Sequence, residues 1–351
     1  MKKRTFILLL LAAVTLYIIF FPAKMKGEMV YRAEWNTSLG AVTGSSESSE
    51  IYSFKTQDEN GAPLLGYIGG DGKLIYSELI HYRAAVSEEG FINYSSTGGI
   101  LVFQDTTGMV IDRLATDGFP LLEEGWFLII SRNRKGVSLM NWEGDTLWSH
   151  QFGSIITALD VNDEALLLGF LNGEVVCIGK DGEVIFIREH RDTVIYSCTL
   201  SSMEGGFAVV SGISPQKLIL YTFSDDDISL LWERELEEEY RTSRSAGFSG
   251  DNKYIFLEES TGLVCYDLTG EKWGHLEFEG ELEKSVFSGN DDLTSLYYKN
   301  SDKAALRISD FGDHFDVEFP FPSDGRIIFL DTNSLIASAR GRIFRVNREV
   351  F

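Results

Sequence analysis

Histidines are the side chains in this sequence best suited to metal binding or acid–base chemistry. They are His81, His150, His190, His275 and His314, and no two of them form an HxH or HExxH motif. His150 and His190 end two similar segments, LWSH and IREH, at equivalent positions of neighbouring repeats. Equivalent positions around a ring can converge on a central channel, so these two are the candidate metal ligands. Both segments are expected outer strands, however, which favours histidines at the rim.

Nucleophilic and redox chemistry has little support. The cysteines Cys177, Cys198 and Cys265 form no CxxC motif and lie among apolar residues, which favours buried, inert thiols. One disulfide with a leftover thiol stays an alternative, because the expected compartment permits it. No G-x-S-x-G segment has the context of a nucleophile elbow, and the Gly-rich stretches are followed by strands, not by a phosphate-binding helix. The sequence therefore predicts no catalytic residue and no cofactor.

The charge of the chain limits its partners. The formal net charge is −22, which repels nucleic acid and anionic lipid headgroups. The acidic runs 225–227 and 233–239 lack EF-hand spacing and are expected to be solvated loops. A basic protein partner or a cationic ligand remains compatible with such a surface.

The N-terminus has the composition of a membrane anchor. A basic stub, residues 1–4, precedes an uncharged run over 5–21, which would form a helix of about 25 Å, near the lower limit for crossing a bilayer. We expect a transmembrane signal anchor over 5–23 and a linker over 24–28; a cleaved secretory signal is the alternative. In either case the remaining chain lies outside the cytoplasm, on the periplasmic or extracellular side of the inner membrane.

The remainder of the chain repeats one phrase, a polar turn with a glycine followed by a strand that carries an aromatic residue. The turn glycines are Gly27, Gly72, Gly108, Gly144, Gly182, Gly270 and Gly312, and Asp227 marks a degenerate copy. Successive landmarks are 45, 36, 36, 38, 45, 43 and 42 residues apart. Each unit contains four short strands, as in 84–115 and 156–190, which is the pattern of propeller blades.

The two ends of this region predict how the ring closes. The last unit offers only three strands, RIIFLDT, SLIASAR and RIFRVNR, whereas Met29–Trp35 is an orphan copy of a fourth strand. Pairing them would remove two open sheet edges. We therefore predict one all-β domain, residues 29–351, folded as an eight-bladed β-propeller. Seven blades are the alternative, if residues 191–240 form one irregular blade and a loop.

The phrase Cys265-Tyr-Asp-Leu-Thr-Gly-Glu-Lys-Trp273 resembles the repeat of pyrroloquinoline-quinone-like (quinoprotein-like) propellers, and looser copies occupy 141–148 and 179–186. The GH and WD dipeptides of WD-repeat propellers do not recur as a pair. The resemblance implies that an aromatic residue packs between neighbouring blades, a role that falls by position to Tyr31, Tyr76, Trp148, Phe186, Trp232 and Trp273. The quinone-dependent members often carry vicinal cysteines, which are missing here, so no quinone cofactor is expected.

Two functions of different classes fit this architecture. The first is a non-catalytic scaffold that binds envelope proteins, similar in kind to the assembly-factor propeller of the outer-membrane protein insertion machinery. That protein is a lipoprotein, whereas no lipid-anchor cysteine follows the apolar run here. The second is an enzyme or ligand sensor with a site in the central channel. The innermost-strand candidates AAVSEEG, ITALDV and RIIFLD are mostly small and apolar, which favours the scaffold.

Overall fold

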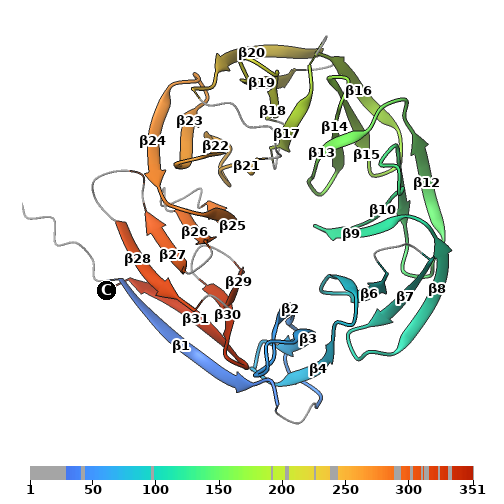
Figure 1. Cartoon of the computed structure of the whole chain (residues 1–351), viewed down its shortest axis with the longest axis vertical. Helices are drawn as coiled ribbons and strands as arrows, with labels where there is room; N and C mark the ends of the chain where they lie inside the picture. Colours follow the sequence, from blue (N-terminus) through green and yellow to red (C-terminus); the bar gives the residue numbers. More distant parts are fainter. Residues whose placement is uncertain are drawn as a thin grey trace, which may run out of the picture.

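The fold was derived from a computed structural model. It describes residues 29–40, 44–95, 99–190, 193–201, 205–224, 227–237, 244–287, 294–300, 303–309, 311, 316–322, 325–330 and 334–350. In these ranges the regular elements are β-strands, and they form eight antiparallel sheets around a central axis (Figure 1). The candidate anchor over 5–23, the linker 24–28, Gly27, Gly312 and His314 lie outside the described residues. Within these residues no helix is long and apolar enough to span a bilayer.

The sheets follow one another along the chain, and we number them as blades. Blade 1 contains β2 (Ile51–Gln57), β3 (Pro63–Gly69) and β4 (Leu74–Leu79). Blade 2 contains β5 (Arg83–Val86), β6 (Gly90–Tyr94), β7 (Gly99–Asp105) and β8 (Val110–Thr116). Blade 3 contains β9 (Phe119–Glu123), β10 (Trp126–Ile130), β11 (Gly136–Met140) and β12 (Thr146–Gln151). Blade 4 contains β13 (Ile156–Val161), β14 (Ala165–Phe170), β15 (Glu174–Gly179) and β16 (Val184–Glu189).

The second half of the ring repeats the arrangement. Blade 5 contains β17 (Ile195–Leu200), β18 (Phe207–Ser211), β19 (Lys217–Ser224) and β20 (Asp227–Glu235). Blade 6 contains β21 (Ala246–Phe248), β22 (Tyr254–Glu259), β23 (Gly262–Asp267) and β24 (Lys272–Glu277). Blade 7 contains β25 (Glu281–Phe287), β26 (Thr294–Lys299), β27 (Ala304–Ser309) and β28 (Asp316–Phe321). Because β17–β20 form a regular blade, the eight-bladed prediction is confirmed over the seven-bladed alternative.

Blade 8 closes the ring with strands from both ends of the described chain. It contains β29 (Arg326–Phe329), β30 (Ser334–Ala339), β31 (Arg342–Val350) and, outermost, β1 (Met29–Ser38). β1 pairs antiparallel with β31, from Met29 opposite Val350 to Ser38 opposite Arg342. Figure 1 shows β1 along the outside of the last blade. The predicted pairing of the termini is confirmed.

The core is divided into eight apolar layers, one between each pair of neighbouring blades. The middle strands of a blade are therefore buried on both faces, as in β14, where every residue from Ala165 to Phe170 is buried. Outer strands such as β16 alternate between exposed and half-buried residues. This explains why the sequences of middle strands are continuous apolar runs, whereas apolar and polar residues alternate in the sequences of outer strands.

Polar side chains join the innermost strands of neighbouring blades, and the edges of these strands that face the central channel have no strand partner among the described residues. Thr157 Oγ1 donates to Ile195 O at 2.6 Å, and Ser197 Oγ donates to Arg244 O at 2.8 Å. Lys55 Nζ donates to Ala84 O at 2.7 Å. These bonds satisfy backbone groups that an open sheet edge would leave exposed.

Candidate functional site

One face of the ring, called the upper face here, carries the turns between first and second strands and those between third and fourth strands. The antiparallel order places both kinds of turn at the same end of each blade. These turns are rich in carboxylates. The described carboxylates in or next to these turns include Asp71, Glu88, Glu89, Asp105, Glu123, Glu124, Glu143, Asp145, Asp163, Glu164, Asp181, Glu183, Asp251, Asp267 and Glu271, beside the bases Lys73, Lys180 and Lys253. The lower face carries the remaining turns, including the basic stretch of Arg132, Arg134 and Lys135.

Several of the upper-face aspartates serve the turns themselves. Asp267 Oδ1 accepts hydrogen bonds from Thr269 N at 2.8 Å, Thr269 Oγ1 at 2.6 Å and Glu271 N at 2.9 Å. Asp105 Oδ1 likewise accepts hydrogen bonds from Thr107 N, Thr107 Oγ1 and Met109 N. Hydrogen bonds to the ionised form lower the pKa of both carboxyl groups. These acids stabilise the turn, so their charge does not indicate a binding site.

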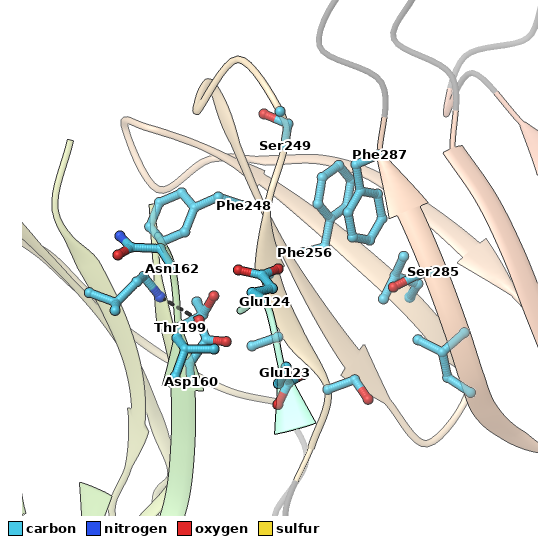
Figure 2. Close-up of a pocket in the computed structure, with 18 residues that line it drawn as sticks. Glu123, Glu124, Asp160, Asn162, Thr199, Phe248, Ser249, Phe256, Ser285 and Phe287 are labelled. Carbon is cyan, nitrogen blue, oxygen red and sulfur yellow. Dashed lines mark hydrogen bonds between the residues drawn. The ribbon is translucent and has the colours of Figure 1, made fainter. Parts of the chain in front are cut away.

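A central hollow in the upper face has a different character. It encloses about 370 Å³ and is lined by residues of blades 3 to 7, most of them in or next to the first strands, together with Phe256 of β22 and Leu263 of β23. Figure 2 shows Asp160 on one side, Phe256 and Phe287 on the other, and Glu123 and Glu124 between them. The rings of Phe256 and Phe287 are stacked with their centroids 3.6 Å apart. One wall is therefore acidic and the other aromatic, a combination that suits a cationic group with an apolar stem.

Asp160 lies at the end of β13 and connects blade 4 to blade 5. Its Oδ2 accepts a hydrogen bond of 2.6 Å from Leu200 N, which is the dashed line in Figure 2. Burial raises the pKa of this carboxyl to about 6, and the charge of Glu123 acts in the same direction. The hydrogen bond from Leu200 opposes this rise without cancelling it. Asp160 is thus a carboxylate whose negative charge is unfavourable where it stands.

Glu124 occupies a conformation that is uncommon for a residue with a side chain. The loop between β9 and β10 consists of Glu124, with φ of 46°, and Gly125, with φ of 73°. Two successive positive φ values characterise a type I′ hairpin, which favours Asn, Asp or Gly at both positions. Partial desolvation and the charges of Asp160, Glu123 and Asp163 raise the pKa of Glu124. A strained backbone and an unfavourable charge meet at one residue in the hollow.

The histidines proposed as metal ligands lie in two separate contacts between blades. His150, on the outermost strand β12, has Nε2 at 2.9 Å from Gly182 O. His190 follows β16 and has Nε2 at 3.3 Å from Tyr221 Oη; burial and the charge of Arg188 lower its pKa. Among the described residues no group of three or more His, Cys, Asp or Glu is arranged to hold a metal ion.

The turn glycines that the structure describes share one conformation. Gly72, Gly108, Gly144, Gly182 and Gly270 have φ between 79° and 88°, each at the turn before the outermost strand of its blade. At four of them an aromatic ring of the preceding blade covers the glycine. The pairs are Trp35 with Gly72, Tyr76 with Gly108, Trp148 with Gly182 and Trp232 with Gly270. At Gly144 the position is taken by Asp112.

The other proposed blade aromatics contact aromatic rings of neighbouring blades instead of a turn glycine. Phe186 stacks on Phe207 of blade 5, with centroids 4.8 Å apart, and Trp273 lies 6.1 Å from Phe311 of blade 7. Tyr31 contacts Phe319 of blade 7, the preceding blade, at 5.5 Å. Trp35, which the sequence did not single out, occupies the position expected of Tyr31. Trp35 lies eight residues after Gly27, whereas Tyr76 and Trp148 lie four residues after their own turn glycines, so counting from Gly27 selects the wrong aromatic.

The three cysteines are buried, and none of them forms a disulfide. Burial raises the pKa of Cys177 to about 12 and also raises that of Cys198. The alternative of one disulfide is therefore not what the structure contains. Neither of these two thiols has the lowered pKa that thiolate chemistry requires.

The hollow departs from the expectation that the innermost strands present mostly small and apolar residues. Asp160 belongs to one of the quoted segments, ITALDV, but its position at the strand end places it at the mouth of the channel. Glu123 and Glu124 were not predicted as channel residues because the segments expected to form innermost strands, AAVSEEG, ITALDV and RIIFLD, do not include β9. The available signal was the pair of glutamates before Gly125, directly after an apolar strand.

Comparison with solved structures identifies propellers. BamB from Moraxella catarrhalis superposes with a TM-score of 0.60 at 13% identity, covering 91% of this chain and 100% of that chain. Hsv2 from Kluyveromyces lactis gives 0.56 at 11% identity, over 76% of this chain and 97% of its own. The dihydro-heme d1 dehydrogenase NirN gives 0.53 at 14% identity, over 73% and 59%. At these identities the likeness concerns the fold alone, which is that of a β-propeller.

A sequence relative and a family model complete the comparison. An uncharacterized protein of Treponema pallidum (strain Nichols) is 22% identical over 205 residues, which is 58% of this chain and 54% of that protein. The chain therefore matches about half the length of this curated relative. A family model described as "beta-propeller protein" matches residues 1–345. The chain belongs to this beta-propeller protein family.

Proposed function

We propose that this protein is a membrane-anchored scaffold that binds envelope proteins through the upper face of its propeller. In this proposal residues 5–23 anchor the chain in the inner membrane, residues 29–351 lie outside the cytoplasm, and the domain is not catalytic. The resemblance to BamB in fold supports a role in protein interaction. The partner would be one or more proteins of the cell envelope.

The observation that carries the proposal is the central hollow of the upper face. Its walls come from five successive blades, and polar bonds such as that between Leu200 N and Asp160 fix the strands beneath it. The hollow combines carboxylates of raised pKa with stacked aromatic rings. A preformed, rigid surface of this kind binds a partner with little loss of conformational entropy.

The path of the chain also favours the upper face as the surface that binds the partner. Met29 pairs with Val350 at the upper end of blade 8, so the chain coming from the proposed anchor enters the ring at the upper face. A linker over 24–28 spans at most about 17 Å when extended. The upper face would then lie close to the membrane surface. Partners with segments next to the membrane would be within reach.

A second candidate function is a ligand sensor or an enzyme that uses the same hollow. The observation that favours it is Asp160, whose pKa of about 6 is in the range of a general acid or base. Charged residues in the central channel favour a catalytic or ligand-binding site, whereas small apolar residues there would favour a scaffold. Glu123, Glu124 and Asp160 are charged residues of this kind. A small cationic ligand would bind there without a protein partner.

The test is to isolate the full-length protein from its native membranes after mild cross-linking. We expect a reproducible, nearly stoichiometric envelope protein that is lost when Glu123 and Glu124 are changed to glutamine. A matched variant, Arg132→Gln with Arg134→Gln on the lower face, should retain it. If the protein is recovered alone while a known complex cross-links efficiently, the scaffold proposal is wrong. Thermal shifts with small cationic ligands would then examine the second candidate.

A further inference from the structure

A second hollow lies on the upper face between blades 2 and 3, and we call it the blade 2/3 groove. It encloses about 450 Å³. Its apolar part includes Val86, Leu122, Trp126, Phe127, Met140 and Trp142. Its acidic part consists of Glu88, Glu89, Glu123 and Glu124. The groove meets the central hollow at the Glu123–Glu124 turn, which lines both.

Trp142 is held in place at one side of the groove. Its ring lies 5.4 Å from that of Phe127, and its Nε1 donates a hydrogen bond to Glu89 Oε2. A Cβ at Gly90 would lie 3.2 Å from the Trp142 ring, so the ring rests directly on the backbone of blade 2. Three contacts from two blades fix this half-buried indole. Its aromatic surface is therefore preorganised.

Another tryptophan near the upper face, Trp126, already has a lysine of this chain over its ring. Lys180 Nζ lies 5.5 Å from the centroid of the Trp126 ring and donates to Asp163 O at 3.4 Å. An ammonium group over an indole beside acidic turns is thus an arrangement that this surface stabilises. The blade 2/3 groove offers the same chemistry to a group from outside.

From these contacts we infer that the blade 2/3 groove binds an extended, basic segment of a partner protein, in which a lysine or arginine stands next to an apolar residue. The basic group lies between Glu88 and the Glu123–Glu124 turn, and the apolar residue packs on Trp142 and Met140. Charge complementarity selects this occupant, because a chain of net charge −22 disfavours nucleic acid, anionic lipid and the upper face of a second copy. The inference rests on the proposed scaffold function and names its partner chemistry.

The probe is a fluorescein-labelled peptide, Gly-Lys-Leu-Lys-Leu-Lys-Gly, titrated by fluorescence anisotropy against the full-length protein in nanodiscs of neutral lipid. Empty nanodiscs give the background. We expect saturable binding that weakens about fivefold in Glu88→Gln with Glu124→Gln, since exposed charge pairs contribute about 0.5 kcal/mol each. The Trp142→Leu variant should weaken binding about tenfold. Circular dichroism checks that each variant is folded.

Matched controls decide between a groove and a diffuse charge effect. Asp181→Asn with Glu183→Gln removes the same charge from the same face outside the groove, and it should leave the affinity unchanged. A peptide with serine in place of leucine should bind about tenfold more weakly. Equal loss in the control variant, equal binding of the serine peptide, or no saturable binding would overturn the inference. Sedimentation showing that the groove mutations abolish self-association of the protein through the basic stretch of Arg132, Arg134 and Lys135 would also overturn the inference. A partner still recovered by cross-linking from membranes would leave the scaffold proposal intact in each case.

Discussion

Trp148 of blade 3 lies against Gly182 of blade 4, and its Nε1 donates a hydrogen bond of 3.0 Å to Lys180 O in the same turn. The glycine serves two needs at once. Its φ of 87° is unfavourable for other residues, and a Cβ there would lie 2.6 Å from Trp148 Cγ. Trp232 and Gly270 repeat the arrangement, with a hydrogen bond of 2.9 Å from Trp232 Nε1 to Leu268 O. The recurring phrase of the sequence is therefore a joint between blades.

The first prediction concerns this joint. Gly182→Ala should lower the free energy of unfolding by about 3 kcal/mol, because the methyl group combines left-handed backbone strain with a clash against Trp148. Urea unfolding followed by tryptophan fluorescence measures the change. Gly153→Ala is the matched control, since Gly153 has open space around its Cβ position. A Gly182→Ala variant as stable as the control would contradict the proposed joint.

The second prediction concerns ring closure. Trp35 covers Gly72 and donates a hydrogen bond of 2.9 Å from Nε1 to Gly70 O, so it fastens β1 to blade 1. Trp35→Ala should cost about 2 kcal/mol and increase hydrogen exchange in both β1 and β31, because an unfastened β1 exposes the edge of the last blade. Tyr31→Ala, on the same strand, should cost about half as much. Equal effects of the two substitutions would show that Trp35 has no special role in closure.

The number of blades could be predicted from sequence because the described turns before five of the outermost strands have a residue with positive φ, and glycine marks that conformation. Closure could be predicted because the last unit lacked one strand. Tyr31 was selected instead of Trp35 because Trp35 lies eight residues after Gly27, whereas Tyr76 and Trp148 lie four residues after their turn glycines. The hollow was missed because Glu124, Asp160 and Phe287 are far apart in the sequence, and only the closed ring brings them together.

The third prediction concerns the pH dependence of stability. The pKa of Asp160 is raised from 3.8 to about 6, so the folded state binds a proton more tightly than the unfolded state. The contribution of this group to stability is therefore largest below pH 4 and falls as the pH rises from about 4 to 6. Asp160→Asn should remove this fall and stabilise the protein at pH 7.5 by about 1–2 kcal/mol.

Urea titrations of the wild type and of Asp160→Asn between pH 4 and pH 8 measure the difference. Asparagine keeps an oxygen that can accept the hydrogen bond from Leu200 N. The turn aspartates with lowered pKa, such as Asp267, act in the opposite sense and are common to both proteins, so they cancel in the difference. A difference that is constant over this range would show that Asp160 does not titrate as the structure indicates.

The fourth prediction separates backbone strain from charge at Glu124. Glu124→Asn should raise the free energy of unfolding at pH 7.5 by about 1 kcal/mol, because asparagine tolerates the positive φ of a type I′ turn and removes a charge from an acidic cluster. Glu124→Gln, the control, removes the same charge but retains a longer side chain at a φ of 46°. The free energy of unfolding of Glu124→Gln should therefore lie between that of the wild type and that of Glu124→Asn.

Both variants should also lose affinity for the basic peptide probe, because each lacks the carboxylate between the two hollows. Greater stability together with weaker binding would mean that the chain retains an unfavourable residue for the sake of its ligand. If Glu124→Asn is no more stable than Glu124→Gln, the turn is not strained at this residue. If both variants bind the probe as tightly as the wild type, Glu124 has no part in recognition, and its conformation needs another explanation.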